Sequence, residues 1–570
     1  MEILKKSWWK EAVVYQIYPA SFYDSNGDGI GDLRGIAEKL DYLVDLGVDV
    51  VWISPYFESP YVDNGYDISD YYKIDKRFGT MDDWDHLLSE MHKRGLKLVM
   101  DLVVNHCSSS HFWFQDALQS KDSPYRNFFI WKDRKQNGQV PNNWTSYFGG
   151  SAWEYSPITD QCYLHLFSKE QPDLNWENPA LRQEIYKMMR FWADKGVDGF
   201  RLDVMHAYGK EPGLPDGVFQ RSASGAPVGI EHFSSIEKTH GYIREMNEQV
   251  FSRYDLMTVG ETGDVTIQDA IKFTNEASRE VNMVFQFDHV DIEPEKDENG
   301  ICLSRACTYT LKKMLSKWQT GLLGKGWNSL YLSNHDQPRQ VSKFGDDKEY
   351  WSESAKMLAA VMHLQQGTPF IYQGEEIGMT NLKVNSIQEV NDIMSVGNYY
   401  ERLYSRQASE EQLLAEINAV GRDNARTPMQ WDRSTNAGFT AGTPWLKVNP
   451  NFQTINVRDS MESPDSIYHF YKKLIKLRHK NPVAVYGDYR EYYKDSQELF
   501  VFTRRLGHTL LLTAANITGS CAEFRMPEDI HYAHSELYIS NYEDTQTPGD
   551  CLLRPYEVQA FLLEETCTGV

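Results

Sequence analysis

The stretch GVDGFRLDV (residues 196–204) follows a helical pattern and is predicted to be a short buried strand. Arg201 and Asp203 stand two residues apart in it, and side chains at positions i and i+2 of a strand point to the same face. Both side chains therefore project into the same space. Such a pair either ties neighbouring strands together or takes part in chemistry at the end of the strand.

Strand-like and helical segments alternate around this stretch along most of the chain. Eight apolar runs are predicted strands, at residues 13–22, 48–55, 96–106, 196–204, 256–261, 281–287, 329–336 and 367–376. Helical patterns separate them, as in ENPALRQEIYKMMRFWADKG (177–196), where Asn178 can cap the helix and Pro179 suits its first position. Near-continuous apolar strands alternating with helices indicate a parallel sheet covered by helices. Eight such units predict an α/β fold, the (β/α)8 TIM barrel.

The chain is predicted to contain two further units besides the barrel. After the third strand the regular pattern gives way to an aromatic, polar and Gly/Asn-rich segment, which indicates an inserted subdomain. After the last helical pattern, short alternating strands indicate an all-β C-terminal domain. We therefore expect the barrel at 1–106 and 177–482, the inserted subdomain at 107–176, and a C-terminal β-sandwich at 483–570.

Acidic residues dominate the charge of the chain. It has 58 Lys and Arg against 81 Asp and Glu, a formal net charge of −23, and this balance repels nucleic acid and anionic membranes. No apolar run approaches the roughly 20 residues that a membrane span needs, and the start resembles no export signal. The seven cysteines lack CxxC spacing, so we expect reduced thiols in a cytoplasmic protein.

Polar and ionisable residues end several of the predicted strands. These are Asn105 and His106, Arg201 and Asp203, Glu261, and His335 and Asp336. In a barrel of this kind the C-terminal strand ends form the active site. Two carboxyl groups suit the cleavage of a glycosidic bond, one protonated to assist the leaving oxygen and one ionised to attack. We expect Arg201 to keep Asp203 ionised, and the apolar run before Glu261 to keep that carboxyl protonated.

The loop DSNGDGIGD (24–32) has the oxygen spacing of a cation site. Positions 1, 3, 5, 7 and 9 of the EF-hand pattern are taken by Asp24, Asn26, Asp28, the Ile30 carbonyl and Asp32. Position 12 is Gly35 instead of a bidentate glutamate, so a standard EF-hand is excluded. The alternatives are a polar turn and a structural cation site, and we expect structural Ca²⁺, with Mg²⁺ as the other candidate.

Five motifs together resemble one enzyme family. DLVVNH (101–106), QPDLNWENP (171–179), GFRLDV (199–204), VGET (259–262) and SNHDQPR (333–339) resemble the sequence regions of the α-amylase superfamily, glycoside hydrolase family 13. The resemblance runs across essentially the whole chain and is closest to the branch of oligo-1,6-glucosidases and sucrose isomerases. It also implies a structural Ca²⁺ in the loop described above.

The resemblance implies roles for individual residues. It makes Asp203 the nucleophile, Glu261 the acid/base and Asp336 the stabiliser of the transition state. The residues that it implies around the nonreducing terminal glucose are Asp67, His106, Arg201, His335 and Arg422 as hydrogen-bonding groups, Tyr66 as a stacking ring, and Phe148, Phe167 and Gln171 as lining. Val204 accompanies α-1,6 cleavage in this branch. The chain departs from the branch at Met205 and His206 and over 217–241, where the second sugar would bind.

The resemblance implies an exo-acting retaining α-glucosidase that hydrolyses α-1,6 bonds of isomaltose, isomaltooligosaccharides and panose. We expect it to act on small oligosaccharides as a monomer or weak oligomer. The alternatives are an α-1,4-preferring α-glucosidase, a sucrose isomerase or glucosyltransferase, and a noncatalytic relative that escorts transporters. The isomerases carry an Arg-rich loop after the sixth strand, whereas FDHVDIEPEKDENG (287–300) is acidic and has no arginine.

Overall fold

Eight parallel strands form the core of the computed structural model, which describes residues 6–219, 227–545 and 547–565. They are β1 (Val14–Ile17), β2 (Val50–Ile53), β5 (Lys97–Leu102), β9 (Gly199–Leu202), β10 (Met257–Thr262), β11 (Met283–Gln286), β14 (Ser329–Leu330) and β15 (Thr368–Tyr372). Their order is β11-β10-β9-β5-β2-β1-β15-β14, and a parallel bridge between Val284 and Asn328 closes the ring. The predicted (β/α)8 barrel is confirmed.

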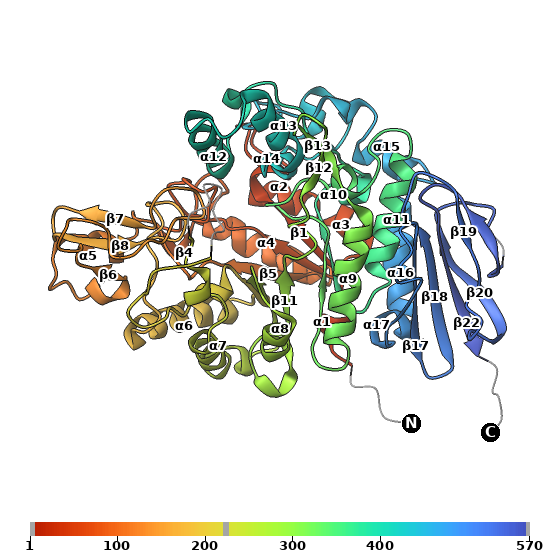
Figure 1. Ribbon diagram of the computed structural model, residues 1–570, viewed down its shortest axis with the longest axis horizontal. Helices are drawn as coiled ribbons and strands as arrows, with labels where there is room; N and C mark the ends of the chain where they lie inside the picture. The colour runs from red at the N-terminus through yellow and green to blue at the C-terminus, as the bar shows by residue number, and fades with distance from the viewer. Residues whose placement is uncertain (1–5, 220–226, 546, 566–570) are drawn as a thin grey trace.

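Helices cover the outside of the barrel (Figure 1). They are α2 (Leu33–Glu38), α3 (Leu40–Leu46), α4 (Met81–Lys93), α6 (Pro179–Asp194), α7 (Glu237–Gln249), α8 (Ile267–Thr274), α9 (Thr308–Leu322), α11 (Trp351–His363) and α16 (Ile467–Lys480). The start of α6 follows the prediction, because the Asn178 side chain accepts a hydrogen bond from the Ala180 amide and Pro179 opens the helix. The helical pattern GIAEKLDYLVDLG (35–47) falls on two helices, α2 and α3, that meet at Lys39.

An inserted subdomain follows β5 and lies at the left end of the molecule in Figure 1. It contains α5 (Phe112–Gln119) and a three-stranded sheet of β6 (Trp131–Lys132), β8 (Gln161–Leu164) and β7 (Trp153–Ser156). Sequence analysis did not predict a second group, α12 (Ile393–Tyr404), α13 (Glu410–Val420) and α14 (Asp423–Arg426). Gly397 of α12 packs close to the Phe148 carbonyl, so this group meets the subdomain at one side of the barrel.

The C-terminal domain is a two-layer antiparallel β structure. One layer has the order β16 (Arg490–Tyr492), β17 (Leu499–Leu506), β18 (Thr509–Asn516), β22 (Val558–Glu565) and β20 (Tyr532–Ser540), and the other pairs β19 (Ala522–Phe524) with β21 (Cys551–Leu553). Val501, Phe524 and Leu563 share a core between the layers, while Phe502 and Leu511 on the other face join the core of the barrel. No helix within the described ranges is long and apolar enough to cross a membrane.

Candidate active site

Three carboxylates meet at the C-terminal ends of barrel strands. Asp203 directly follows β9, Glu261 lies near the end of β10, and Asp336 lies in the loop after β14. The parallel register pairs Leu202 with Gly260, so Asp203 and Glu261 stand at the same level of the barrel. Both are largely buried, with 4% and 8% of their surface exposed. The strand ends therefore bring together the carboxylates that the sequence predicted.

One guanidinium connects the carboxylates of three strands. Arg201 Nη1 lies 2.5 Å from Asp203 Oδ1 and 2.9 Å from Asp101 Oδ1, and Arg201 Nη2 lies 2.7 Å from Glu261 Oε1. Burial raises the pKa of Asp203, and Glu261 and Asp101 raise it further, although Arg201 lowers it. Burial likewise raises the pKa of Asp101 to about 6 against the opposing effect of Arg201. The prediction that Arg201 keeps Asp203 ionised is opposed by this direction, because burial outweighs the guanidinium.

Sharing one positive charge among three buried carboxylates leaves an excess of negative charge in a poorly solvated place. Full ionisation of both Asp101 and Asp203 is therefore opposed.

The residue after the nucleophile has a strained backbone. Val204 has φ 47° and ψ 36°, the left-handed region that a β-branched residue rarely adopts. In this conformation its amide donates a hydrogen bond of 3.0 Å to Glu261 Oε2. The turn thus ties the backbone beside Asp203 to the carboxylate on the neighbouring strand.

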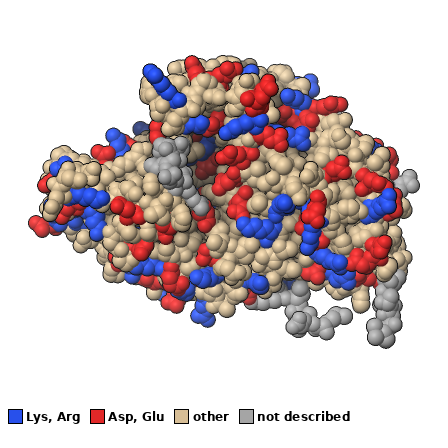
Figure 2. All heavy atoms as spheres, in the orientation of Figure 1, with Lys and Arg blue, Asp and Glu red and all other residues tan. Residues whose placement is uncertain are grey.

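These groups line a cavity of about 360 Å³ between the barrel, the inserted subdomain and α12. Of the residues predicted from sequence, the wall contains Tyr66, His106, Phe148, Phe167, Asp203, Val204, Glu261, Asp336 and Arg422. Further wall residues include Asp63, His206, Gly263, Asp264, Phe287, Asp291 and Met394. Figure 2 shows acidic side chains gathered beside a hollow in this part of the surface.

The structure does not place Asp67 in this cavity, contrary to the prediction. Asp67 has no exposed surface, and its carboxylate accepts hydrogen bonds from Ser59 Oγ and from the amides of Val62 and Asp63. Its role is to hold the loop. Asp63 lies on the wall instead, where its Oδ1 is 3.4 Å from Arg422 Nη2. The sequence motif was found correctly, but the wrong one of two nearby aspartates was chosen.

Three other predicted contact residues lie behind the wall. Gln171 donates to Asp63 Oδ2 at 3.1 Å and to the Tyr66 carbonyl at 3.3 Å, and it has no exposed surface. His335 is also fully buried, stacked against Tyr66 and 2.6 Å from its hydroxyl. Arg201 is 1% exposed. They hold the residues that face the cavity and do not line it themselves.

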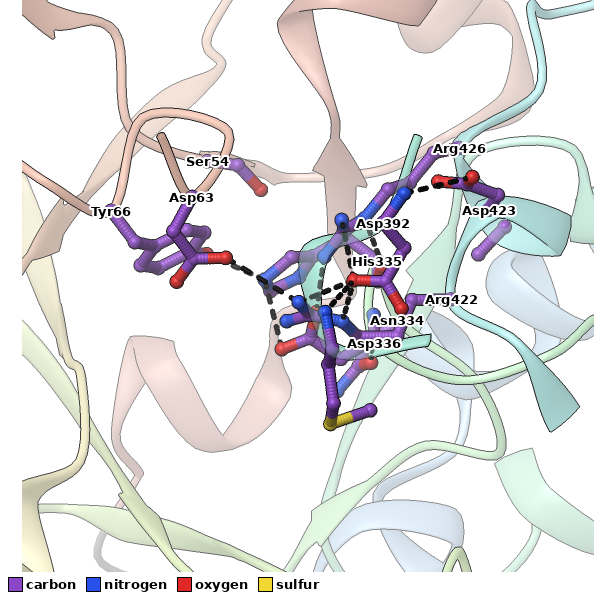
Figure 3. A network of polar contacts seen from close by, with 12 residues as sticks. Ser54, Asp63, Tyr66, Asn334, His335, Asp336, Asp392, Arg422, Asp423 and Arg426 are labelled. Carbon is purple, nitrogen blue, oxygen red and sulfur yellow. Dashed lines mark hydrogen bonds and ion pairs between the residues drawn. The ribbon is translucent and has the colours of Figure 1, made fainter. Parts of the chain in front are cut away.

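Asp336 is surrounded by positive charge (Figure 3). Its Oδ1 lies 2.6 Å from Arg426 Nη2 and 3.3 Å from Arg422 Nη1, and Asp392 in turn pairs with Arg422 at 2.5 Å. Burial raises the pKa of Asp336, but His335, Arg422 and Arg426 outweigh it and hold the pKa far below the usual range. Asp336 is therefore a fixed negative charge in the cavity. Sequence analysis missed Asp392, which no recognised motif contains.

A buried lysine joins the inserted subdomain to the barrel beside this cavity. Lys210 Nζ lies 2.7 Å from Asp173 Oδ2, 3.1 Å from Asn105 Oδ1 and 2.6 Å from the Ala207 carbonyl. Asn105 precedes His106, which faces the cavity. The ammonium group thus holds three oxygens from separate segments in one place.

The oxygens of the 24–32 loop are turned towards the loop's own amides. Asp24 accepts from the amides of Asn26, Gly27 and Gly29, and Asp32 accepts from Ser25 and from the Gly35 amide as the cap of α2. Within the part of the chain that the structure describes, no three His, Cys, Asp or Glu side chains converge as a metal site. These hydrogen bonds order the loop, and since a carboxylate oxygen that accepts an amide hydrogen bond can also bind a cation, the oxygen-rich donor set fits a hard cation.

Carboxylates at the ends of neighbouring barrel strands, with a third carboxylate beside them, are the arrangement that a glycoside hydrolase needs. The chain belongs to the α-amylase family, whose catalytic domain ("Alpha amylase, catalytic domain") matches residues 16–487. This membership confirms the family predicted from the motifs.

Relatives of known activity match nearly the full chain. An oligo-1,6-glucosidase of Parageobacillus thermoglucosidasius is 54% identical over 98% of this chain and 99% of its own. A trehalose-6-phosphate hydrolase of Bacillus subtilis is 45% identical over the full length of both. Among solved structures, isomaltulose synthase from Klebsiella sp. LX3 superposes with a TM-score of 0.92 at 40% identity, covering 98% of this chain and 100% of its own.

Proposed function

We propose that the protein is an exo-acting retaining α-glucosidase that hydrolyses α-1,6 bonds at the nonreducing end of isomaltose, isomaltooligosaccharides and panose. The observation that carries the proposal is the arrangement of Asp203, Glu261 and Asp336 around one cavity. Asp63 and Arg422 both line the cavity and form an ion pair with each other. An ion pair on one side of the cavity suits a site that accepts the end of a sugar chain. Four oligo-1,6-glucosidases at 50–54% identity support the linkage.

The geometry supports double displacement. Glu261 protonates the oxygen that leaves, while Asp203 attacks the anomeric carbon and forms a covalent glucosyl intermediate. Glu261 then removes a proton from water, which releases glucose with its original configuration. The permanently ionised Asp336 stabilises the positive charge that develops on the sugar ring in both steps.

Val204 supports the α-1,6 preference. Its side chain lies on the cavity wall next to the nucleophile and offers an apolar surface without a hydroxyl. An α-1,4 bond joins the next sugar directly at a ring carbon that is flanked by hydroxyls, whereas a 1,6 bond adds a flexible exocyclic CH₂ group. Valine therefore favours the 1,6-linked substrate by withholding a hydrogen bond from the other.

Trehalose 6-phosphate is a second candidate substrate, because one relative is named as a trehalose-6-phosphate hydrolase. Six carboxylates line the cavity (Asp63, Asp203, Glu261, Asp264, Asp291 and Asp336), against one arginine, Arg422. This balance opposes a phosphorylated sugar. The acidic loop 287–300 likewise opposes sucrose isomerisation, although isomerases share the fold.

A product assay tests the proposal. Purified enzyme is incubated with isomaltose, maltose, sucrose, trehalose and trehalose 6-phosphate, and sugars are separated by chromatography. The largest kcat/KM on isomaltose, with glucose as sole product, is expected. A larger value on trehalose 6-phosphate, or isomaltulose formed from sucrose, would assign the protein to one of its other relatives.

We also propose that the 24–32 loop binds Ca²⁺, or Mg²⁺ in its place, and that the protein works in the cytoplasm as a monomer or weak oligomer. The spacing of Asp24, Asn26, Asp28 and Asp32 with the Ile30 carbonyl supports the cation. Free cysteines support a reducing compartment, since Cys107, Cys162, Cys302, Cys307, Cys521 and Cys551 form no disulfide.

A further inference from the structure

A second cavity, of about 420 Å³, lies outside the catalytic site. One wall comes from the inserted subdomain, within residues 121–132 and at Gln161, and the other comes from residues 175–177 before α6 and 208–214 after β9. We call it the subdomain cavity. Among the described residues it shares no lining side chain with the catalytic cavity. Its volume lies within the roughly 300–1,000 Å³ of small-molecule sites, so it has room for a small organic ligand.

Arg126 places a buried positive charge at this cavity, with 5% of its surface exposed. Its Nη1 donates to the Ala117 carbonyl at 2.7 Å, and its Nη2 donates to Thr159 Oγ1 at 3.1 Å and to Gln161 Oε1 at 2.5 Å. All three acceptors are neutral. Burial lowers the pKa of the guanidinium to about 10, so the group stays charged at neutral pH. A buried charge without a counter-charge is costly, and an anion in the cavity would supply the missing charge.

Two exposed lysines line the same wall as Arg126. Lys121 follows α5, the helix to which Arg126 is bonded through the Ala117 carbonyl. Lys132 follows Trp131, and the guanidinium carbon of Arg126 lies 3.4 Å from the centre of that indole ring. Arg126 therefore stands between the two segments that carry the lysines, and the wall presents three positive charges.

Carboxylates near this wall are already paired with other cations. Asp160 pairs with Arg134 at 3.4 Å, and Asp216 pairs with Lys135 at 3.9 Å. Within the described ranges, no carboxylate oxygen lies within 4.0 Å of the three cations on the wall. The chain as a whole has a formal net charge of −23 and the catalytic cavity is acidic, so this uncompensated positive wall is a local exception that attracts anions.

The other wall carries groups that suit sugar hydroxyls. Glu177 and Glu211 line it, and each is held by a partner, Lys238 for the first and His232 for the second. A carboxylate held by one partner still has lone pairs that accept further hydrogen bonds. The subdomain cavity thus offers cations on one wall and hydrogen-bond acceptors on the other.

We propose that the subdomain cavity is a second ligand site that binds a phosphorylated monosaccharide. The phosphoryl group lies against Lys121, Arg126 and Lys132, which bind it through charge-assisted hydrogen bonds. The sugar hydroxyls donate to Glu177 and Glu211. A phosphate ion alone would leave most of the volume unfilled, and a neutral sugar would leave the positive wall without a counter-charge.

Calorimetric titration of the full chain tests the proposal. The protein used is Glu261→Gln, which cannot protonate a leaving oxygen, and the disaccharide that the wild type cleaves fastest is added in excess to keep the catalytic cavity occupied. Glucose 6-phosphate should then bind with a Kd below about 1 mM. Glucose and inorganic phosphate should each bind at least about 10-fold more weakly, because each lacks one half of the contacts.

Two double variants in the same background identify the site. Lys121→Gln with Lys132→Gln should raise the Kd for glucose 6-phosphate at least about 10-fold and leave the melting temperature unchanged, since both side chains are exposed. Lys187→Gln with Lys272→Gln is the matched control, because it makes the same change in net charge on the exposed faces of α6 and α8. The control should keep the original Kd.

Each of the contrary results overturns the proposal. No binding, or an unchanged Kd in Lys121→Gln with Lys132→Gln, would show that the positive wall holds no ligand. An equal loss in the control would show unspecific attraction by charge, and equal affinity for inorganic phosphate would show a site for the anion alone. Binding that disappears when the disaccharide is present would place glucose 6-phosphate in the catalytic cavity. The hydrolytic function is decided separately by the product assay.

Discussion

Replacing Lys210 with methionine removes a buried ammonium group while keeping most of the volume of the side chain. The variant leaves the Asp173 carboxylate, which has no exposed surface, with only the Leu166 amide at 2.9 Å and the Asn105 amide group at 3.3 Å. A charge buried in this way is poorly compensated by neutral donors. Since Asp173 comes from the inserted subdomain and Asn105 from the barrel segment just after β5, the contact between subdomain and barrel should weaken.

The magnitude follows from the loss of one partner in a buried ion pair, about 3–5 kcal/mol. We expect the midpoint of thermal unfolding to fall by several degrees and kcat to decrease, because Asn105 positions the adjacent His106 at the cavity. Asp173→Asn together with Lys210→Met removes the orphaned charge, and this double variant should be more stable than Lys210→Met alone.

Thermal melting by circular dichroism at one scan rate and isomaltose kinetics measure these effects. Lys187→Met on the exposed face of α6 is the matched control, since its pair with Glu184 is 3.6 Å long and solvated, and its effect should stay within about 0.5 kcal/mol. If Lys210→Met melts like the wild type, or if the double variant is no more stable than the single one, the reasoning about the buried charge is wrong.

Four further outcomes are expected. Glucose released from isomaltose should appear first as the α anomer by NMR, and early β-glucose would exclude double displacement. Val204→Thr should narrow the preference for isomaltose over maltose by roughly 10- to 200-fold, chiefly by raising activity on maltose; an unchanged ratio of kcat/KM would refute its role. Chelation should lower the melting temperature of the wild type but not of Asp28→Ala, and identical responses of the two proteins would contradict a cation in the 24–32 loop. Burial raises the pKa of Glu375 from its ordinary 4.5 to about 8, so the folded state keeps a proton that the unfolded state releases, and stability falls as pH rises through this window. Glu375→Gln should flatten that fall by up to ~1.4 kcal/mol per pH unit, and parallel denaturation midpoints for both proteins between pH 5 and 8 would show that Glu375 titrates normally.

The barrel and its catalytic carboxylates could be predicted from local patterns. A parallel strand buried on both faces must be apolar, so polar residues such as Asp203 and Glu261 stand out where each strand ends. The eight strands and the capped start of α6 depend on such short-range signals. The α12–α14 group also has local signals, an Asp392 cap on α12 and a Ser409–Gln412 capping box on α13, but its position against the subdomain depends on packing.

The contact residues needed the tertiary structure. Asp63 and Asp67 are four residues apart in one polar loop, and only the path of the backbone turns one carboxylate into the cavity and the other onto loop amides. Gln171 and His335 carry suitable chemistry but stand behind residues that reach the cavity first. Side-chain direction in loops has no periodicity from which it can be derived.

Sequence alone determined the architecture, the family and the three carboxylates at the strand ends, because strand periodicity and motif order are properties of the chain itself. Tertiary structure alone decided how charge is shared among them. Arg201 serves Asp101, Asp203 and Glu261 together, and Lys210 joins oxygens from three segments. Electrostatic energy depends on distances between atoms far apart in sequence and on their removal from water, and both arise only when the chain folds.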